Sequence, residues 1–265
     1  MSGQLQVTDA MIDFGGVKAL NGVSLTFGAG QATGVIGPNG SGKSTLLAAV
    51  SRLIDLTEGT LSWGGEDYTH APRYQPARLG IARSFQTVRL VQTATVIENV
   101  MVGASVDAAK RSPVSNWLRV RRAAREEHEL RRRARAALER VGLVGHEDDY
   151  PDSLPYGFQR RVEIARALAA DPQILLLDEP VAGMIQEERA DVLRLLKQLR
   201  SEGLSLVLVE HDLSMVYELC DTVYVLNFGQ LIASGTSSVV ARSPEVRAAY
   251  IGDESDDRVT EKAEA

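Results

Sequence analysis

The sequence predicts an α/β fold in which a parallel sheet with flanking helices is preceded by an antiparallel β front. Short apolar runs recur at residues 32–36, 174–177 and 205–209, and such runs are typical of strands buried on both faces of a parallel sheet. Residues 186–203, between the last two runs, have an amphipathic pattern that predicts a helix ending at Gly203. Strand, helix and strand at this spacing indicate a crossover unit, although short buried helices stay an alternative for any run taken alone.

The segments around these strands complete the expected order of elements. Up to about Trp63 the sequence has alternating patches such as VSLTF at 23–27, and this pattern predicts antiparallel strands. The stretch 95–140 has no strand pattern. We therefore expect a helical subdomain at about residues 91–165, inserted into the α/β core.

Length and composition are those of one globular domain. The chain has 265 residues, and we expect that domain to span residues 1–252, followed by an acidic, disordered tail at 253–265. No apolar run reaches the roughly 18 residues of a membrane-spanning helix, and the N-terminus lacks the basic start and apolar block of an export signal. The single cysteine, Cys220, excludes an internal disulfide and fits a reducing cytosol, and we expect it to be a small buried residue.

The charge pattern argues against nucleic acid and marks one unusual stretch. The net charge is −6, which disfavours a nucleic-acid-binding surface. Residues 119–140 are a strongly basic exception. Arginine and glutamate lie four apart there in Arg122–Glu126, Arg125–Glu129, Glu127–Arg131 and Glu129–Arg133. This spacing predicts ion pairs along an exposed helix, with a docking surface for a partner or for anionic lipid headgroups as the alternative.

A glycine-rich segment with phosphate-binding character follows the first buried strand. GPNGSGKST fits G-x-x-x-x-G-K-[ST], and it stands between an apolar strand and a helical pattern, as this motif requires. Its glycines let successive backbone N–H groups face one anion, and the next helix adds its positive end. We expect Lys43 to reach the β- and γ-phosphates and the hydroxyl of Ser44 to bind Mg²⁺. The expected nucleotide-binding residues are Gly37, Pro38, Asn39, Gly40, Ser41, Gly42, Lys43, Ser44 and Thr45. With this segment, the predicted α/β core is that of a P-loop NTPase fold.

Two carboxylates follow the second buried strand. ILLLDEP places Asp178 and Glu179 at the carboxyl edge of the sheet, where α/β proteins bind ligands. We expect Asp178 to hold the Mg²⁺ shell and Glu179 to polarise the attacking water. An acidic loop without a catalytic role is the alternative, and the phosphate-binding segment disfavours it.

Two further side chains are candidates for the same site. His211 ends the third buried strand, so it is a candidate contact for the γ-phosphate. Gln86, in RSFQ, is a weaker candidate for contacting Mg²⁺ and the water. The remaining histidines lie in polar stretches and are expected to have no catalytic role; they are His70, His128 and His146.

In their order along the chain, these segments resemble the ATP-binding subunits of ABC transporters. The general motifs are residues 37–45, Gln86, 154–168, 174–180 and His211. The resemblance narrows to the LivG-type subunits of branched-chain amino acid importers, through stretches that lie largely outside those motifs. They are FGGVKALNGVSL, RSFQTVRL, TVIENVMVG, YGFQRRVEIARAL and PEVRAAYIG, and the similarity extends over about residues 4–252.

The resemblance implies an assembly of several subunits with ATP and Mg²⁺ as cofactors. Two ATPase subunits close head to tail, so that each ATP lies between one phosphate loop and the other subunit's signature segment. Two membrane permeases hold the subunit at the cytoplasmic face of the membrane, and an external solute-binding protein works through them. By the same resemblance, Phe14 stacks on adenine, unless it is only an apolar residue ending the first strand. Gln86 links nucleotide and permeases, and the helical subdomain receives a permease helix.

The signature segment departs from the family pattern Leu-Ser-Gly-Gly-Gln. Its five positions are Leu154, Pro155, Tyr156, Gly157 and Phe158. Pro155 supplies neither the serine hydroxyl nor a backbone N–H. Gly157 and the N-terminus of a helix expected from about Phe158 still offer donors to the partner's nucleotide. Ile185 stands where the family commonly has an aspartate.

We therefore expect a heterodimer rather than a homodimer, in which this chain hydrolyses ATP at its own phosphate loop. The expected function is to couple ATP hydrolysis to the uptake of branched-chain amino acids. Alternatives are an importer ATPase for another small solute, such as an amide, urea, another amino acid or a carboxylate, and a soluble regulatory ATPase of the same family. A GTPase is disfavoured because the sequence has no N-K-x-D segment.

Overall fold

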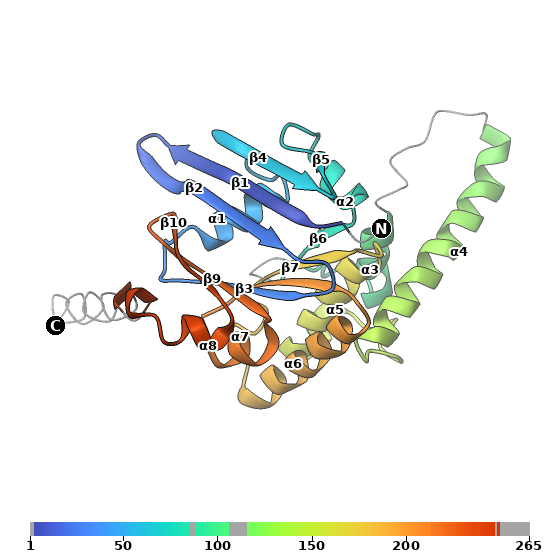
Figure 1. The fold of residues 1–265 in the computed structure, drawn as a ribbon. Helices are drawn as coiled ribbons and strands as arrows, with labels where there is room; N and C mark the ends of the chain where they lie inside the picture. The colour runs from blue at the N-terminus through green and yellow to red at the C-terminus, as the bar shows by residue number, and fades with distance from the viewer. Residues whose placement is uncertain (1–2, 85–87, 106–115, 212, 247, 250–265) are drawn as a thin grey trace, which may run out of the picture.

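A six-stranded sheet forms the centre of the protein (Figure 1). The computed structural model describes residues 3–84, 88–105, 116–211, 213–246 and 248–249. The strand order is β10–β9–β3–β8–β7–β6, and every neighbouring pair except β10–β9 is parallel. The strands are β3 (Ala32–Ile36), β6 (Ile81–Arg83), β7 (Ile174–Asp178), β8 (Ser205–Val209), β9 (Thr222–Asn227) and β10 (Gln230–Gly235). All three apolar runs are thus strands, and helix α6 (Gln186–Ser201) joins the adjacent parallel strands β7 and β8, which confirms the predicted α/β fold.

A second, four-stranded antiparallel sheet forms the predicted front. Its order is β2–β1–β4–β5. The strands are β1 (Leu5–Phe14), β2 (Val17–Phe27), β4 (Glu58–Trp63) and β5 (Glu66–Asp67). Helix α1 (Lys43–Val50) packs in the same core cluster as this sheet.

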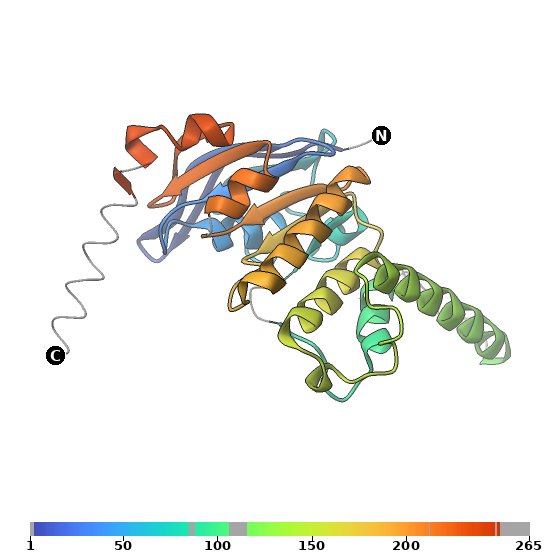
Figure 2. The same cartoon turned by 90° about the horizontal axis from the view of Figure 1, so that it is seen from below.

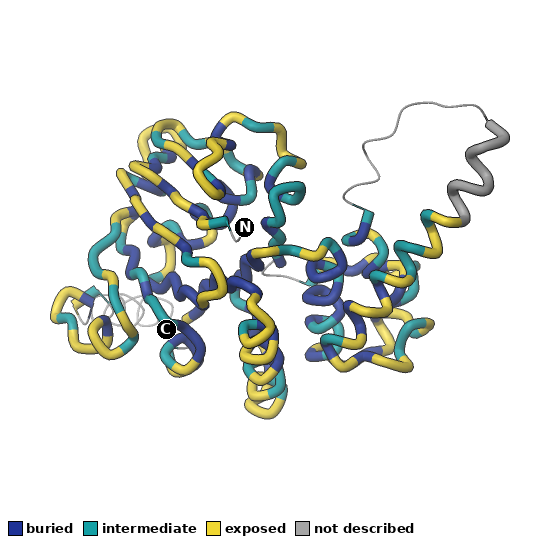
Figure 3. The backbone as a smooth tube through the Cα atoms, turned by 45° about the vertical axis from the view of Figure 1, so that its right-hand side comes forward, coloured by how far each residue is buried: buried dark blue, intermediate teal, exposed yellow. Residues whose placement is uncertain are grey.

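The central sheet separates two hydrophobic cores, because successive side chains of its strands point to opposite faces. Leu175 and Leu177 of β7 join a core with helices α3, α5 and α6. Ile174 and Leu176 of the same strand join the other core, with α1 and the four-stranded sheet. Figure 3 shows the buried residues gathered along the inner strands and the inward helix faces. Helices α1 and α5 therefore lie on opposite faces of the central sheet.

Three helices that contact one another make up the helical part of the chain. They are α3 (Val96–Ala104), α4 (Asn116–Arg140) and α5 (Tyr156–Leu168). Helix α3 begins at a capping box, in which Thr95 and Glu98 each accept a backbone N–H hydrogen bond from the other. The shorter helices are α2 (Gln75–Arg78), α7 (Leu213–Leu219) and α8 (Ser237–Val240), with a 3₁₀ turn at Pro151–Ser153. The boundaries 91–165 and 1–252 stay predictions, and 253–265 lies outside the described residues.

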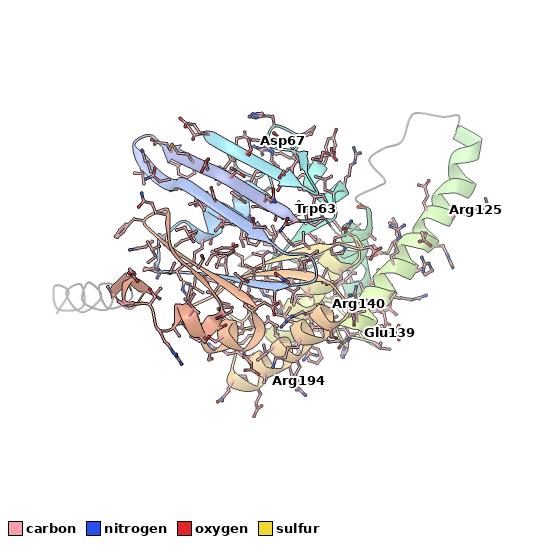
Figure 4. All side chains as sticks on the ribbon, viewed as in Figure 1. Trp63, Asp67, Arg125, Glu139, Arg140 and Arg194 are labelled. Carbon is pink, nitrogen blue, oxygen red and sulfur yellow. The ribbon has the colours of Figure 1, made fainter. Side chains whose placement is uncertain are left out.

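Helix α4 extends away from the rest of the protein, as Figures 1 and 2 show. Two of its predicted ion pairs are present, Glu127–Arg131 at 3.7 Å and Glu129–Arg133 at 3.0 Å. Glu129 also accepts hydrogen bonds from Arg132, and these two arginines lower its pKa to about 2. Arg125 is exposed and lies farther along the projecting part, away from Arg140 (Figure 4). The described part of the basic stretch thus has ion-paired, largely exposed charged side chains on one face, while Ala134, Ala137 and Leu138 on the other face are buried in the core.

Two helix ends differ from their predicted positions. Helix α5 begins at Tyr156 rather than at about Phe158, because Pro155 stands at the N-cap with φ −52° and needs no N–H there. Helix α6 ends at Ser201, before Gly203, which has a positive φ of 92°. Within the described part of the chain, no helix has both the length and the apolar character to cross a bilayer.

The burial of Cys220 predicts that the folded chain resists thiol reagents. The residue is 7% exposed, and burial, with the nearby charge of Asp221, raises the pKa of its thiol to about 12. Because the thiolate is the reactive form, a disulfide reagent at about pH 8 should label the folded chain far more slowly than the denatured chain. Cys220 is the only cysteine, so the labelled fraction reports on it alone. Equal rates for the two states would contradict this prediction.

Candidate nucleotide site

The segment from Gly37 to Gly42 turns from the end of β3 into α1, and glycine is required at both ends. A Cβ on Gly37 would lie 2.0 Å from the carbonyl oxygen of Leu226. Gly42 has φ 101°, and a Cβ there would lie 2.4 Å from the carbonyl oxygen of Ala19. Side chains at these positions would collide with backbone, so the loop is held close to its neighbouring strands. Gly42 directly precedes α1, which leaves the first N–H groups of that helix next to the loop.

Lys43 folds back over the loop. Its side chain is buried, and its Nζ donates to the carbonyl oxygens of Gly37 at 2.8 Å and Pro38 at 2.7 Å. The hydroxyl of Ser41 is also buried and has no hydrogen-bond partner. A buried polar atom of this kind calls for an oxygen or nitrogen partner, which a phosphate can supply. The loop therefore fits a phosphate group.

Asp178 connects the phosphate loop to the central sheet. It is the last residue of β7 and is 2% exposed. Its Oδ1 accepts a hydrogen bond from Oγ of Ser44 at 3.1 Å, and its Oδ2 pairs with Nη2 of Arg83 at 2.9 Å. The structure thus brings together Ser44 and Asp178, the predicted Mg²⁺ ligands, and places a cation from β6 beside them. A buried carboxylate requires such partners.

Glu179 and His211 form a hydrogen-bonded pair at the same edge of the sheet. Glu179 has φ 47°, in the left-handed region that is uncommon for residues other than glycine. Its N–H donates to the carbonyl oxygen of Val209 at 2.9 Å, and its Oε1 lies 2.6 Å from Nε2 of His211. The side chain of Glu179 is 13% exposed and that of His211 is 46% exposed. A carboxylate with restricted solvent access is thus next to an imidazole that faces outward.

The signature segment lies at the N-terminus of α5, on the face of the sheet opposite α1. Pro155 is the N-cap of α5. Because proline has no hydroxyl, no side-chain capping hydrogen bond is made there. The N–H of Gly157, one of the donors left at this helix end, already donates to Oε1 of Glu188 at 3.2 Å. The other oxygen of Glu188 accepts the N–H of Ile185 at 3.3 Å. A carboxylate of the same chain thus lies at the N-terminus of α5.

The other signature residues divide between the interior and the surface. Leu154 is buried and Tyr156 is exposed. The ring of Phe158 packs inside the chain, with its centroid 5.4 Å from that of His146 and 5.4 Å from Cζ of Arg161. The side chain of Phe158 is thereby occupied within the helical part, and its backbone N–H already donates to the carbonyl oxygen of Pro155 at 2.9 Å.

Two of the remaining predicted residues are exposed on the surface. Phe14 is the last residue of β1 and is exposed, which leaves its ring free to stack on a base. Ile185 is exposed directly before α6. Gln86 lies outside the described residues.

The donor set fits magnesium held together with a nucleotide. Among the residues that the structure describes, no group of three or more His, Cys, Asp or Glu side chains can hold a metal ion. Ser44 and Asp178 supply only two oxygen ligands. Mg²⁺ commonly keeps waters and binds phosphate oxygens, with only one or two protein ligands. These two residues therefore match a Mg²⁺–nucleotide complex better than a metal cage made of protein alone.

Four charged residues that were not predicted from the sequence contact the site. Arg83 pairs with Asp178, and Glu188 reaches Gly157. The buried Glu210 accepts the N–H of His211 at 3.1 Å and that of Val181 at 3.2 Å, so it ties the two segments together. Arg160 donates to the backbone after β7. Each of the four lies within three residues of a predicted position, but closeness in sequence does not indicate which side chain turns toward the site, because the contacts arise from tertiary packing.

The sequence is similar to known transport ATPases over nearly its whole length. The ABC transporter family profile matches residues 20–182. The chain is 38% identical, over 250 residues, to the high-affinity branched-chain amino acid transport ATP-binding protein LivG of Salmonella typhimurium. It is 36% identical, over 254 residues, to BraF of Pseudomonas aeruginosa, which has the same description. Each alignment covers 94% of this chain and 98% of the relative.

The solved structures that are similar to this chain are also ATP-binding cassettes of ABC transporters. A nucleotide-free ATP-binding cassette from an ABC transporter has a TM-score of 0.80 and 30% identity, covering 94% of this chain and 98% of that chain. The ADP conformation of the cassette MJ1267 also has a TM-score of 0.80 and 30% identity, covering 95% of this chain and 100% of that chain. The resemblance predicted from the motifs is thereby confirmed. The chain belongs to the ABC transporter family and carries its ATP-hydrolysing cassette.

Proposed function

We propose that this chain is the ATP-hydrolysing subunit of an importer for branched-chain amino acids, held at the cytoplasmic face of the membrane. The observation that carries the proposal is the 2.6 Å contact between Glu179 and His211, at the sheet edge that also bears the phosphate loop. The named relatives support the solute, because they are described as branched-chain amino acid transport proteins and match almost the whole chain. An external solute-binding protein would deliver the amino acid to two permeases.

In this proposal the phosphates of ATP lie against residues 37–45. The loop N–H groups, the N-terminus of α1 and the ammonium of Lys43 stabilise their negative charge. Glu179 orients the attacking water and accepts its proton, while the adjacent imidazole of His211 donates toward the γ-phosphate. Ser44, Asp178 and Gln86 would hold Mg²⁺, which when bound would neutralise charge on the phosphate oxygens. Phe14 stacks on the adenine.

The partner subunit in this proposal is a second ABC ATPase with an intact signature segment, which gives a heterodimer. This chain's phosphate loop has its full set of side chains, whereas its own signature segment faces the partner's ATP without a serine. Loss of one hydrogen bond to a charged group weakens a contact by roughly 1.5–3 kcal/mol. The Glu188 carboxylate weakens the contact further, because it takes up the N–H of Gly157 and brings negative charge toward the partner's γ-phosphate.

A hollow between the α/β core and the helical part is the proposed docking place for a permease helix. Its lining comes from both parts and includes Pro76, Ile81, Arg83, Val102 and Arg166. Arg83 also pairs with Asp178, so a helix seated there would contact a side chain that touches the metal-binding carboxylate. This gives a short physical route from the permease to the nucleotide.

The substitution Glu179→Gln tests the proposed base. It keeps the size of the side chain and removes the proton acceptor, so we expect kcat for ATP hydrolysis in the assembled complex to fall on the order of 10²- to 10⁴-fold. ATP binding should be retained, as measured with a fluorescent nucleotide. Glu187→Gln, an exposed site in the first turn of α6, is the matched control and should hydrolyse ATP normally. Unchanged hydrolysis and transport in Glu179→Gln would refute the assignment.

A second prediction concerns the altered signature. In the Glu179→Gln background, which retains ATP, the chain alone should form little ATP-dependent dimer. Adding Pro155→Ser offers one new hydrogen bond at each of two symmetric sites, so self-association should tighten on the order of 10²- to 10⁴-fold. Analytical ultracentrifugation with and without ATP measures the change. A tight dimer without the serine would overturn the proposed asymmetry.

A third prediction concerns the subunits. We expect the tagged chain, extracted from its native membranes in mild detergent, to co-purify with two permeases and a second ATPase whose signature has a serine. Mass spectrometry identifies them, and binding of leucine, isoleucine and valine to the associated binding protein tests the solute. Recovery of permeases with copies of this chain alone would contradict the heterodimer, and recovery without permeases would favour a soluble regulatory ATPase.

A further inference from the structure

Arg160 is the largest fully buried side chain of the described residues, and it faces the catalytic loop. It lies in the second turn of α5, with only 1% of its side chain exposed. Its Nη2 donates to the carbonyl oxygens of Asp178 at 3.1 Å and Glu179 at 2.8 Å. Its Nε donates to the carbonyl oxygen of Pro180 at 3.0 Å. One guanidinium thus holds three successive carbonyls at the end of β7.

Two of these carbonyls, those of Glu179 and Pro180, lie beyond the last residue of β7. The pairing of β7 with β8 ends at Asp178, opposite Val209. Glu179 then turns into the left-handed region at φ 47°, a conformation that a residue with a Cβ keeps only when its surroundings impose it. Its N–H is held by Val209, and its carbonyl is held by Arg160. The backbone that sets the direction of the Glu179 side chain is therefore fixed on one side by β8 and on the other by α5.

Glu163, one turn along α5, connects Arg160 to another part of the site. Its Oε2 pairs with Nη1 of Arg160 at 2.7 Å, and its side chain is fully buried. Its Oε1 accepts the backbone N–H of Arg89 at 3.0 Å and a hydrogen bond from Arg166 at 3.2 Å. Arg166 also donates to the carbonyl oxygen of Arg89 at 2.6 Å. Residue 89 follows closely after Gln86, so α5 is bonded both to that segment and to the loop of Glu179.

Packing alone does not account for this arrangement. A buried ion pair is weak support for stability, because an apolar side chain of similar volume often serves as well. The planar fork of arginine can donate to several acceptors in fixed directions, which a lysine ammonium on a flexible stem cannot reproduce. Here Nε and Nη2 are directed to backbone carbonyls of the catalytic loop, and Nη1 is directed to Glu163. The hydrogen bonds of the Arg160 guanidinium therefore fix the position of the catalytic loop, which burial of an apolar side chain would not do.

We propose that Arg160 is a positioning residue for ATP hydrolysis. It fixes the backbone of residues 178–180 so that Glu179 points at the attacking water, and Glu163 makes this position depend on the segment that follows Gln86. The inference rests on the proposed role of Glu179. A displacement of the segment around Arg89, adjacent to the proposed permease-docking hollow, would be passed through Glu163 and Arg160 to the catalytic carboxylate.

The test compares Arg160→Lys with a control of the same chemistry in the assembled complex. A misdirected catalytic group costs rate rather than binding, so kcat should fall on the order of ten- to a hundredfold while KM for ATP changes little. The control is Arg200→Lys. Arg200 likewise donates to a backbone carbonyl, that of Leu219, and pairs with Asp221, but it lies where β3 begins, at the sheet edge away from the site. Its kcat should stay at the level of the unmodified chain.

Glu163→Gln provides a second variant if Arg160→Lys does not fold, as judged by circular dichroism and gel filtration. It removes the charge that orients Arg160 and retains an acceptor for Arg89, so it should also lower kcat with little change in KM. A fall in stability with normal kcat in the folded variants would overturn the proposal. So would a rise in KM at constant kcat.

A double-mutant cycle separates the inference from the proposed function. If Arg160 acts through Glu179, Arg160→Lys should have little further effect on single-turnover hydrolysis once Glu179→Gln is present. If Arg160→Lys lowers the single-turnover rate by the same factor with Glu179 and with Gln at position 179, Arg160 acts elsewhere and the inference is overturned. Normal hydrolysis in Glu179→Gln alone would instead remove the proposed role of Glu179. If Glu179→Gln loses ATP hydrolysis but Arg160→Lys keeps a normal kcat, the proposed function stands and only the positioning role of Arg160 is rejected.

Discussion

The parallel pairing of β3, β8 and β7 is the constraint on which the site depends. Val35, Val209 and Asp178 lie in one row across these strands. The segments that leave the sheet just beyond this row are therefore neighbours, whatever their separation in sequence. They are the phosphate loop, the segment of His211 and the loop of Glu179. A slip of one residue would turn Asp178 to the opposite face, away from Ser44 and Arg83.

This convergence places several charges at a partly buried edge, and the fold balances them. Asp178 is buried against Arg83 and Ser44, while Glu210 is satisfied by two backbone N–H groups. Lys43 lies over loop carbonyls that a phosphate can replace as its partners. A buried charge without such partners would cost several kcal/mol. The edge can therefore stay folded before nucleotide arrives and still offer its donors when phosphate binds.

Features that depend on neighbours in sequence could be predicted, and features that depend on neighbours in space could not. The buried strands β3, β7 and β8, the α6 crossover and the phosphate loop follow from local periodicity and glycine spacing, and so does the Glu127–Arg131 ion pair, whereas β6, β9 and β10 were not predicted. The Arg160 and Glu188 contacts join α5 to segments about 20 and 30 residues away along the chain, and no local pattern specifies such pairing. Helix α5 starts earlier than the sequence predicts, because the fixed φ of Pro155 suits the N-cap position directly before Tyr156.

The two departures at the signature segment act on one helix end by different means. Pro155 removes a hydroxyl donor, and Glu188 takes up the N–H of Gly157 and supplies a negative charge where an N-terminal helix dipole attracts one. At this helix end the N–H groups of Gly157 and Phe158 therefore already have acceptors within the chain. At the opposite face of the sheet, the buried hydroxyl of Ser41 still lacks a partner. The signature end thus has its Gly157 donor occupied, whereas the phosphate loop has a buried hydroxyl without a partner, and the proposed heterodimer is based on this difference between the two ends.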